Sequence, residues 1–255
     1  MPRPVYLYAR AAYLPVLAGF PVPGFEPVAA GIPKKALKTM TRAVQLGVAC
    51  VANALALVTD WQAIPPGRRG LFVGASPQQG DAEDLFPAID ASGTTPNLRL
   101  FAEFGVPLVP PLWLVKGLSN NVLGYASANH DLRGDNGNWC DGRLGGAVAV
   151  AAAIQSVAEG RVDLAIGGAA DSLVGADEIL GRPCGEGAVF FVFGTVPTPW
   201  CAHAGVPTEA GAAEDIGELG AVSIPAALSR QLAASNIAFA GGVSLTPASR
   251  DQPFA

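Results

Sequence analysis

Between residues 134 and 169 the hydrophobic and polar positions follow a simple order: a short mixed segment, a long apolar run and a short apolar segment. In the long run, residues 144–159, nine of the sixteen residues are Ala or Val, and Glu159 alone is charged. A helix without a polar face has to be buried on most of its sides. We therefore predict a strand, a tight turn, a buried helix that stops at Gly160, and a buried strand over residues 162–166.

Helical and strand-like patterns also alternate along the rest of the chain. Strands are predicted at residues 4–12, 70–75 and 237–245, and helices within residues 34–57, after the proline pair 110–111 and at residues 226–234. Segments rich in proline and glycine separate them and indicate loops. This alternation is typical of an α/β fold.

Composition narrows the class of protein. Half of the 255 residues are apolar and 15% are charged, which is ample material for a buried core. A net charge of -5 and a pI near 5.0 argue against nucleic acid as a partner. The mean hydropathy is +0.35, yet no apolar run has the length of a membrane span, and prolines interrupt any signal peptide. We expect a cytoplasmic protein.

The four cysteines show no spacing that indicates a metal site. They lie far apart, without a Cys-x-x-Cys pair, and the chain has two histidines. Reduced, buried thiols are the expected state of such cysteines in a cytosolic protein. We predict neither a metal nor a cofactor.

The central stretch resembles the nucleophile turn of the β-ketoacyl synthases, within the thiolase-like superfamily. In that family a Gly-x-Asn opens the strand, as Gly134 and Asn136 do here, and a glycine such as Gly160 closes the following helix. Residues 168–172, Gly-Ala-Ala-Asp-Ser, fit the next segment of the family without a gap. The family's catalytic cysteine lies nine residues after the first glycine. This chain has Arg143 there, and Cys140 lies three residues early.

The resemblance covers nearly the whole chain and implies a fold. Residues 185–188, Gly-Glu-Gly-Ala, are typical of ketosynthases, and residues 216–223 are similar to a motif that carries a catalytic histidine, with Glu218 in its place. The implied fold is α/β, a thiolase-like layered α/β/α/β/α arrangement in one domain, 1–255. Its N-terminal half, 1–195, is intact and its C-terminal half, 196–255, is truncated. Residues 81–104 would form a helical excursion over the active-site side.

The two replaced positions predict a degenerate active site. Decarboxylative condensation needs a thiolate to carry the acyl chain and donors, usually two histidines, to stabilise negative charge. Arg143 stays protonated and cannot be the nucleophile, and a carboxylate at Glu218 would repel an oxyanion. A buried Arg143 needs a carboxylate partner. Four carboxylates are candidates: Asp141, Asp171, Glu186 and Glu218. Such an Arg143 would plug the former acyl site or reach across a subunit interface; otherwise it points to solvent.

An enzymatic alternative stays open. If the turn shifts its register, Cys140 could lie near a helix N-terminus, where the pKa of a thiol falls. His203 stands in a segment that is faintly similar to the family's histidine loop, so the two could form a Cys/His pair. The simpler interpretation makes Cys140 an apolar filler and His203 a loop residue.

The resemblance also implies partners. A chain-length-factor type subunit pairs with an active ketosynthase, as a heterodimer, in fatty acid, polyketide or aryl polyene biosynthesis, and meets the acyl carrier protein through that partner. The strand before the nucleophile pairs across the dimer, which here predicts an interface at Asn136, Asn138, Trp139 and Cys140. A homodimer that holds an acyl ligand is a third possibility. Four basic residues, Lys34, Lys35, Lys38 and Arg42, form either a solvated face or a docking patch for an acidic carrier protein.

Overall fold

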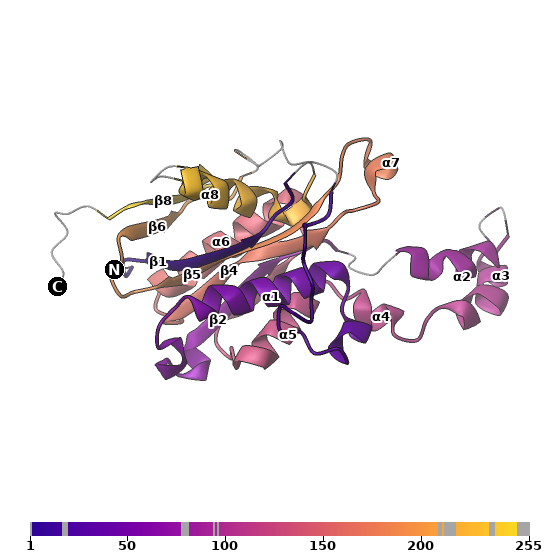
Figure 1. Cartoon of the computed structure of the whole chain (residues 1–255), viewed down its shortest axis with the longest axis horizontal. Coiled ribbons are helices and arrows are strands. Elements are labelled where there is room, and N and C mark those ends of the chain that lie inside the picture. Colours follow the sequence, from indigo (N-terminus) through magenta and orange to yellow (C-terminus); the bar gives the residue numbers. More distant parts are fainter. Residues whose placement is uncertain are drawn as a thin grey trace.

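The computed structural model describes residues 2–16, 20–77, 82–93, 95, 97–208, 211, 218–234 and 238–248. Eight strands form one sheet in the order β3-β2-β4-β5-β1-β6-β8-β7 (Figure 1). Their bounds are β1 Tyr6–Tyr13, β2 Arg69–Gly74, β3 Asn136–Trp139, β4 Leu164–Ser172, β5 Glu186–Gly194, β6 Trp200–Ala204, β7 Ala238–Ala240 and β8 Val243–Pro247. The β2 strand runs parallel to β3 and β4, and the other neighbours are antiparallel.

Four longer helices cover the two faces of this sheet. On one face lie α1 (Arg42–Ala56) and α5 (Asn121–His130), and on the other α6 (Gly142–Ala158) and α8 (Ser223–Ala234) (Figure 1). The shorter helices are α2 Phe86–Asp90, α3 Leu98–Leu100, α4 Trp113–Lys116 and α7 Asp177–Leu180. Single turns of 3-10 helix span Ala36–Thr39, Trp61–Ala63, Pro66–Arg68, Ala82–Leu85, Val106–Leu108 and Gly220–Val222, and a π-helical turn spans Phe101–Gly105.

The α6 helix confirms the prediction from composition. It packs against β2 and β4 on one side and against β6 and α8 on the other, so it lies inside the molecule. Glycines allow this close packing: a Cβ on Gly74 of β2 would lie 2.5 Å from the main chain of Gly145, and a Cβ on Gly146 would collide with the carbonyl oxygen of Ala221. The helix ends before Gly160, whose φ of +77° favours glycine.

The chain contains a structural duplication. In the first half, β1 is followed later by α6, β4 and β5, and β5 lies between β4 and β1. In the second half, β6 is followed by α8, β7 and β8, and β8 lies between β7 and β6. The strands of the two halves pair at Tyr6 of β1 and Cys201 of β6, and the amide of Ala202 donates to the carbonyl oxygen of Val5 at 2.9 Å. Thus α6 and α8 are equivalent helices of the two halves.

The described residues supply four of the five predicted layers. They are α1 with α5, the β3-β2-β4-β5-β1 part of the sheet, α6 with α8, and the β6-β8-β7 part of the same sheet. This last part curls round so that it also contacts α6 and α8. No described residue forms a helix layer outside β6-β8-β7. The fold class is therefore α/β, with layers in the predicted order.

The outer face of β6 and β8 carries mostly polar residues, so it can lie in water without a covering helix. Paired residues on it are Cys201 with Thr246 and His203 with Ser244, whereas the buried residues Ala202 and Leu245 face inward. Alternation of this kind is the pattern of a sheet with one face in water.

Two predicted helices are broken. The predicted helix in residues 34–57 is a 3-10 turn, Ala36–Thr39, and then α1, because Met40 is extended and Thr41 begins the helix anew. The helix after the proline pair divides into α4 and α5, with residues 117–120 between them. Periodicity alone does not show these breaks, since apolar positions continue through both.

Candidate functional site

The turn between β3 and α6 holds the residue at the position of the family's nucleophile. Cys140 and Asp141 follow β3, and Gly142 begins α6 with a φ of +49°, a backbone conformation that favours glycine. Arg143 therefore lies in the first turn of α6, where the helix dipole disfavours a cation. Its charge has to be neutralised by a nearby carboxylate.

Glu218 is that carboxylate. The Arg143 guanidinium donates from Nε and Nη2 to Glu218 Oε2 at 3.0 and 2.7 Å, and Arg182 Nη2 approaches the same oxygen at 2.8 Å. Glu218 is 5% exposed, and its Oε1 accepts the amide proton of Gly220. Burial by itself raises the pKa of Glu218, but the hydrogen bonds from Arg143 and Gly220 and the positive charges of Arg143 and Arg182 outweigh it and lower the pKa. Glu218 is thus held as an anion.

The two members of this ion pair come from equivalent parts of the two halves. Arg143 lies in the first turn of α6, and Glu218 lies in the turn before α8, the equivalent helix of the second half. The two residues thus come from the turns at corresponding ends of the two central helices. A direct ion pair joins these turns.

Asp171, at the end of β4, is a second buried carboxyl beside this pair. It accepts hydrogen bonds from Ser76 Oγ at 2.6 Å and from the amide of Ala221 at 3.1 Å. Burial raises its pKa to about 6, against the lowering effect of these hydrogen bonds, and the negative charge of Glu218 adds to the increase. Asp171 therefore titrates where ordinary aspartates are fully ionised.

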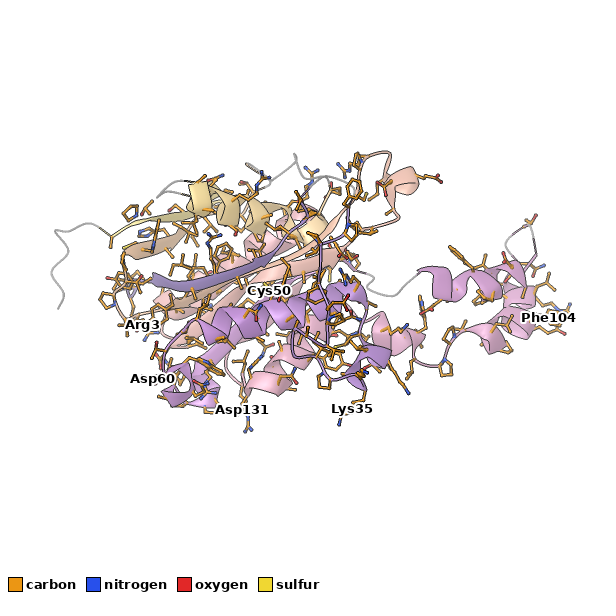
Figure 2. The ribbon with its side chains drawn as sticks, in the orientation of Figure 1. Arg3, Lys35, Cys50, Asp60, Phe104 and Asp131 are labelled. Atoms are coloured by element: carbon orange, nitrogen blue, oxygen red, sulfur yellow. The ribbon has the colours of Figure 1, made fainter. Side chains whose placement is uncertain are left out.

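Glu186, another candidate partner of Arg143, is engaged elsewhere. Its carboxylate accepts hydrogen bonds from Arg42 Nη2 at 2.8 Å, from the amide of Val22 at 2.9 Å and from Ser172 Oγ at 3.1 Å. Arg42 is thereby removed from the predicted basic patch, which is a correction: its guanidinium neutralises a carboxylate that is 1% exposed. Lys34, Lys35 and Lys38 are exposed, and Figure 2 shows Lys35 at the surface.

Cys140 and His203 lie in separate surroundings. Cys140 is exposed; its sulfur lies 3.4 Å from Asn138 Nδ2 and 3.9 Å from the carbonyl oxygen of Ser76. His203 lies in β6, opposite Ser244 of β8, on the outer face. Within the described residues, no hydrogen bond of the Cys140 thiol involves an imidazole.

The predicted interface strand, β3, is an edge of the sheet. It pairs with β2 on one side, and no strand of the described residues pairs with its other side, where backbone groups are available to solvent or to another chain. Asn136 is exposed, and the Oδ1 atom of Asn138 is buried without a hydrogen-bond partner. The ring of Trp139 turns toward the body of the protein, where it stacks on Phe72 with ring centroids 6.2 Å apart.

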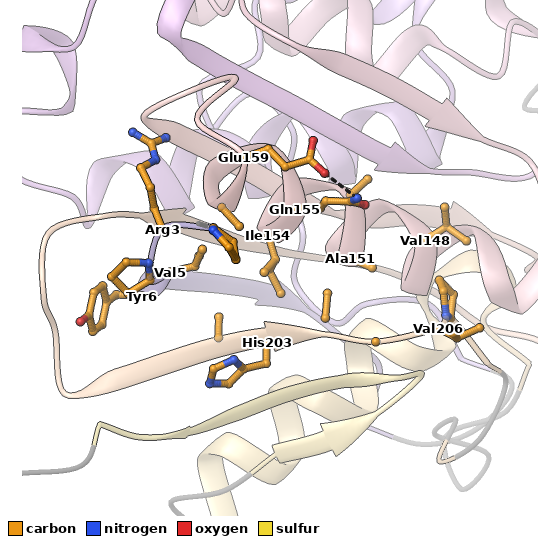
Figure 3. Close-up of a pocket in the computed structure, with 18 of the residues that line it drawn as sticks. Arg3, Val5, Tyr6, Val148, Ala151, Ile154, Gln155, Glu159, His203 and Val206 are labelled. Atoms are coloured by element: carbon orange, nitrogen blue, oxygen red, sulfur yellow. Dashed lines mark hydrogen bonds between the residues drawn. The ribbon is translucent and has the colours of Figure 1, made fainter. Parts of the chain in front are cut away.

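A groove runs beside α6, with a volume of about 1270 Å³. Its walls come from α6, from β6 with the residues that follow it, and from the segment before β1 (Figure 3). Apolar residues such as Val148, Ala151 and Ile154 form its floor, and Trp139 lies at its margin. Arg3, at one end, is already engaged by Asp163 at 3.1 Å. The groove is separate from the Arg143–Glu218 pair, neither of which lines it.

Sequence reasoning missed several members of the polar site. Arg182 shares Glu218 with Arg143, Ser76 binds Asp171, and Arg42 binds Glu186. Ser76 and Arg182 lie in loops without periodicity, and Arg42 and Glu186 are 144 residues apart. The one available signal was that each buried carboxylate needs a donor, which does not say which donor it is.

The described residues contain neither a candidate metal cluster nor a candidate membrane span. Within the described residues, no group of three or more His, Cys, Asp or Glu side chains is arranged to hold a metal ion. Over the same part of the chain, no helix has the length and apolar character needed to cross a bilayer.

Comparison with known proteins gives matches to solved structures. No protein-family profile and no curated protein matches the chain. A type II polyketide synthase acyl carrier protein in complex with its ketosynthase bound to the hexaketide (AntDE:AntF) is similar at a TM-score of 0.62 and 15% identity, over 76% of this chain and 62% of that one. The ishigamide ketosynthase/chain length factor is similar at 0.59 and 16%, over 77% and 59%. A beta-ketoacyl synthase from Burkholderia phymatum STM815 is similar at 0.55 and 18%, over 83% and 67%.

These matches cover most of this chain but only part of the proteins that they compare. The chain spans about three fifths of the length of the first two chains it matches. At such identities the likeness concerns the fold, and activities and partners do not follow from it. With the two central helices, the edge strand before α6 and the duplicated strand order, the chain has a ketosynthase-like fold of the thiolase type.

Proposed function

We propose that this chain is a non-catalytic, ketosynthase-like subunit of the chain-length-factor type. It pairs with an active β-ketoacyl synthase in polyketide, fatty acid or aryl polyene biosynthesis. Contact with an acyl carrier protein then occurs through that partner. The solved ketosynthase/chain length factor and the carrier protein–ketosynthase complex among the similar structures support these partner classes.

The observation that carries the proposal is the Arg143–Glu218 ion pair. Condensing enzymes use a thiolate and imidazoles, and the resemblance implies the thiolate at the position of Arg143 and one of the imidazoles at the position of Glu218. A guanidinium cannot form a thioester, and Glu218, with its lowered pKa, stays an anion. The ion pair joins the first turn of α6 to the turn before α8, so both members lie at positions that the resemblance gives to catalytic groups.

Pairing is supported by the free edge of β3. Backbone groups at a sheet edge are a template for a strand of another chain. We assign Asn136, Asn138, Trp139 and Cys140 to this interface, with Trp139 contributing mainly its main chain because its ring faces inward.

Acyl loading tests the absence of catalysis. The purified chain is incubated with an acyl thioester, and its mass is measured against that of Cys140→Ala. We expect no covalent acyl adduct on the unchanged chain. A stoichiometric adduct that disappears in Cys140→Ala would contradict the proposal and favour the Cys140/His203 enzyme, and His203→Ala would then slow the loading.

Native mass tests the pairing. The chain is expressed alone and together with a ketosynthase from the same genome that retains the cysteine and two histidines. We expect a one-to-one complex in the second preparation. A stable homodimer that does not bind the ketosynthase would instead favour the third possibility, a homodimeric protein that binds an acyl ligand without converting it.

A further inference from the structure

The groove beside α6 opens because β1 and β6 pair over a short distance and then separate. The amide of Ala202 in β6 donates to the carbonyl oxygen of Val5 at 2.9 Å. Further along, the amide of Arg3 donates to the carbonyl oxygen of Ala158 in α6, at 2.7 Å, instead of returning to β6. Both sequence neighbours of Arg3 are prolines, which have no amide hydrogen to donate. The segment before β1 therefore follows α6, and β6 loses its neighbour.

The part of β6 that has lost its neighbour is a strand edge inside the groove. Because main-chain groups alternate along a strand, the amide and carbonyl groups of Ala204 point in the same direction as those of Ala202, away from β8. Among the described residues, none of the segment 2–5 forms a main-chain hydrogen bond with Ala204. Ala204 is exposed and lines the groove. A free edge of this kind accepts an extended segment through main-chain hydrogen bonds.

The groove selects an apolar segment without net charge. The helix α6 lies along it, opposite β6 (Figure 3). Three of its apolar side chains line the groove: Val148, Ala151 and Ala152. Both charged side chains of the lining are already paired, Arg3 with Asp163 at 3.1 Å and Glu159 with Arg161 at 2.9 Å. The main-chain groups of β6 need hydrogen-bond partners, which a peptide supplies and a hydrocarbon chain does not.

The chain leaves β8 close to one end of this groove. The amide of Ala248, the residue after β8, donates to the carbonyl oxygen of Pro199, the residue before β6, at 2.8 Å. The groove begins at Tyr6 of β1, on the other side of β6 and two strand spacings, about 10 Å, away. Residues 249–255 follow, and seven extended residues span about 23 Å. About four residues thus remain for the groove, enough to run along β6 from Ala202 to Ala204.

The sequence of residues 249–255 fits this path. It reads Ser-Arg-Asp-Gln-Pro-Phe-Ala. The two charged residues, Arg250 and Asp251, come first and cancel each other, so they belong to the part that passes the start of β6 in water. The apolar residues Pro253, Phe254 and Ala255 come last, where the apolar lining of α6 is within reach.

We propose that residues 252–255 lie in the groove as an added strand that runs parallel to β6, with Phe254 against the apolar side chains of α6. The segment then links the end of the second half to the central helix of the first half. This inference is independent of the proposed function, because it involves neither the Arg143–Glu218 pair nor β3.

Disulfide trapping in the full chain tests the position of Phe254. The variant Ala152→Cys/Phe254→Cys places one thiol in the groove and one in the segment. The matched control is Ala128→Cys/Phe254→Cys, because Ala128 is exposed on α5, on the other face of the sheet. Both carry Cys140→Ser, which removes an exposed native thiol. A disulfide forms where the two Cα atoms come within about 4.4–6.8 Å. Peptide mapping identifies the linked cysteines, and the mass under non-reducing conditions shows whether they belong to one chain.

We expect a disulfide within one chain in the groove variant, in about tenfold higher yield than in the control. Equal yields, or no disulfide in the groove variant, would overturn the inference. A disulfide between two chains would assign the groove to a second copy and would also overturn it.

Amide hydrogen exchange tests the pairing with β6. Phe254→Asp places a charge in an apolar groove and should release the segment, so the amide of Ala204 should exchange about tenfold faster than in the unchanged chain. Phe86→Asp is the control, because it changes a phenylalanine that is 53% exposed on α2 and should leave the exchange of Ala204 as it is. An unprotected Ala204 amide in the unchanged chain, or protection that survives Phe254→Asp, would contradict the added strand.

Discussion

The two halves of the duplicated core differ in what covers them, and their sequences follow that difference. In the first half, β5 lies between layers of helices, and all nine of its residues are buried, with a nearly continuous apolar sequence. In the second half, β8 has helices on one side, and buried and partly exposed residues alternate along it. The same strand position thus carries two hydropathy patterns, because the pattern depends on coverage rather than on topology.

The segments at the start of the two central helices differ in charge. Arg143 lies in the first turn of α6 and Glu218 lies in the turn before α8, and the ion pair joins the halves. The largest effect is expected from Glu218→Ala, which removes the buried carboxylate that Arg143 and Arg182 share. Loss of one member of such a pair should cost about 3 kcal/mol of unfolding free energy, measured by urea denaturation.

A matched control separates charge from packing. In Arg143→Met/Glu218→Leu both charges are replaced by apolar side chains of similar volume, and stability should stay within about 1 kcal/mol of the unchanged chain. If Glu218→Ala were as stable as the unchanged chain, the pair would not connect the halves.

The second largest loss of stability is expected where α6 lies against the turn before α8. Gly146→Ala places a methyl group against the carbonyl oxygen of Ala221, in the turn before α8, and against Pro225. Main-chain atoms cannot move aside easily, so we expect a loss of about 2 kcal/mol by the same denaturation measurement. Gly124→Ala in α5 is the control: a Cβ there meets nothing within 4 Å, and the change should be neutral or slightly stabilising. If Gly146→Ala and Gly124→Ala changed the unfolding free energy equally, α6 would not be tightly packed against the turn before α8.

Asp171 gives an effect that depends on pH. Its pKa of about 6 lies above the 3.8 of an ordinary aspartate, so the folded state binds more protons between these values, and the unchanged chain loses stability as pH rises through that window. Asp171→Asn has no such loss. The stability of the variant relative to the unchanged chain should increase by about 2 kcal/mol between pH 4 and pH 7. A difference independent of pH would show that Asp171 is ionised normally.

The contribution of Glu218 to stability depends on pH in the opposite direction. Its lowered pKa means that its contribution is present above the pKa of an ordinary glutamate and is lost as pH falls through the folded value. Measurements of Asp171→Asn should therefore be compared with the unchanged chain at each pH rather than with a single reference.

The smallest effect belongs to the outer face of the second half. His203→Ala removes an exposed side chain from a face of β6 that the described residues do not cover, so the change in unfolding free energy should be below about 0.5 kcal/mol. A much larger loss would show that this face is packed against something and would remove the contrast between the halves.

Much of the core could be predicted from sequence, because burial leaves a local pattern. The α6 helix followed from a run without polar residues, and Gly160 and the strand of residues 162–166 followed from their neighbours. Arg143 was expected to need a carboxylate, but four carboxylates qualified, and which one is close depends on how α6 and α8 meet. The Arg42–Glu186 pair joins residues 144 positions apart, so Arg42 looked like a member of a basic surface run.

The position of β1 has a consequence for synthesis of the chain. Strand β1 is finished by residue 13, but its neighbours β5 and β6 begin at residues 186 and 200. At a translation rate of about 5–20 residues per second, an apolar segment emerges from the ribosome roughly 10 to 30 seconds before either neighbour exists. Pairing at such separation is slow, and unpaired strands aggregate. We therefore expect β1 to stay unpaired and prone to aggregation until β5 and β6 have been synthesised.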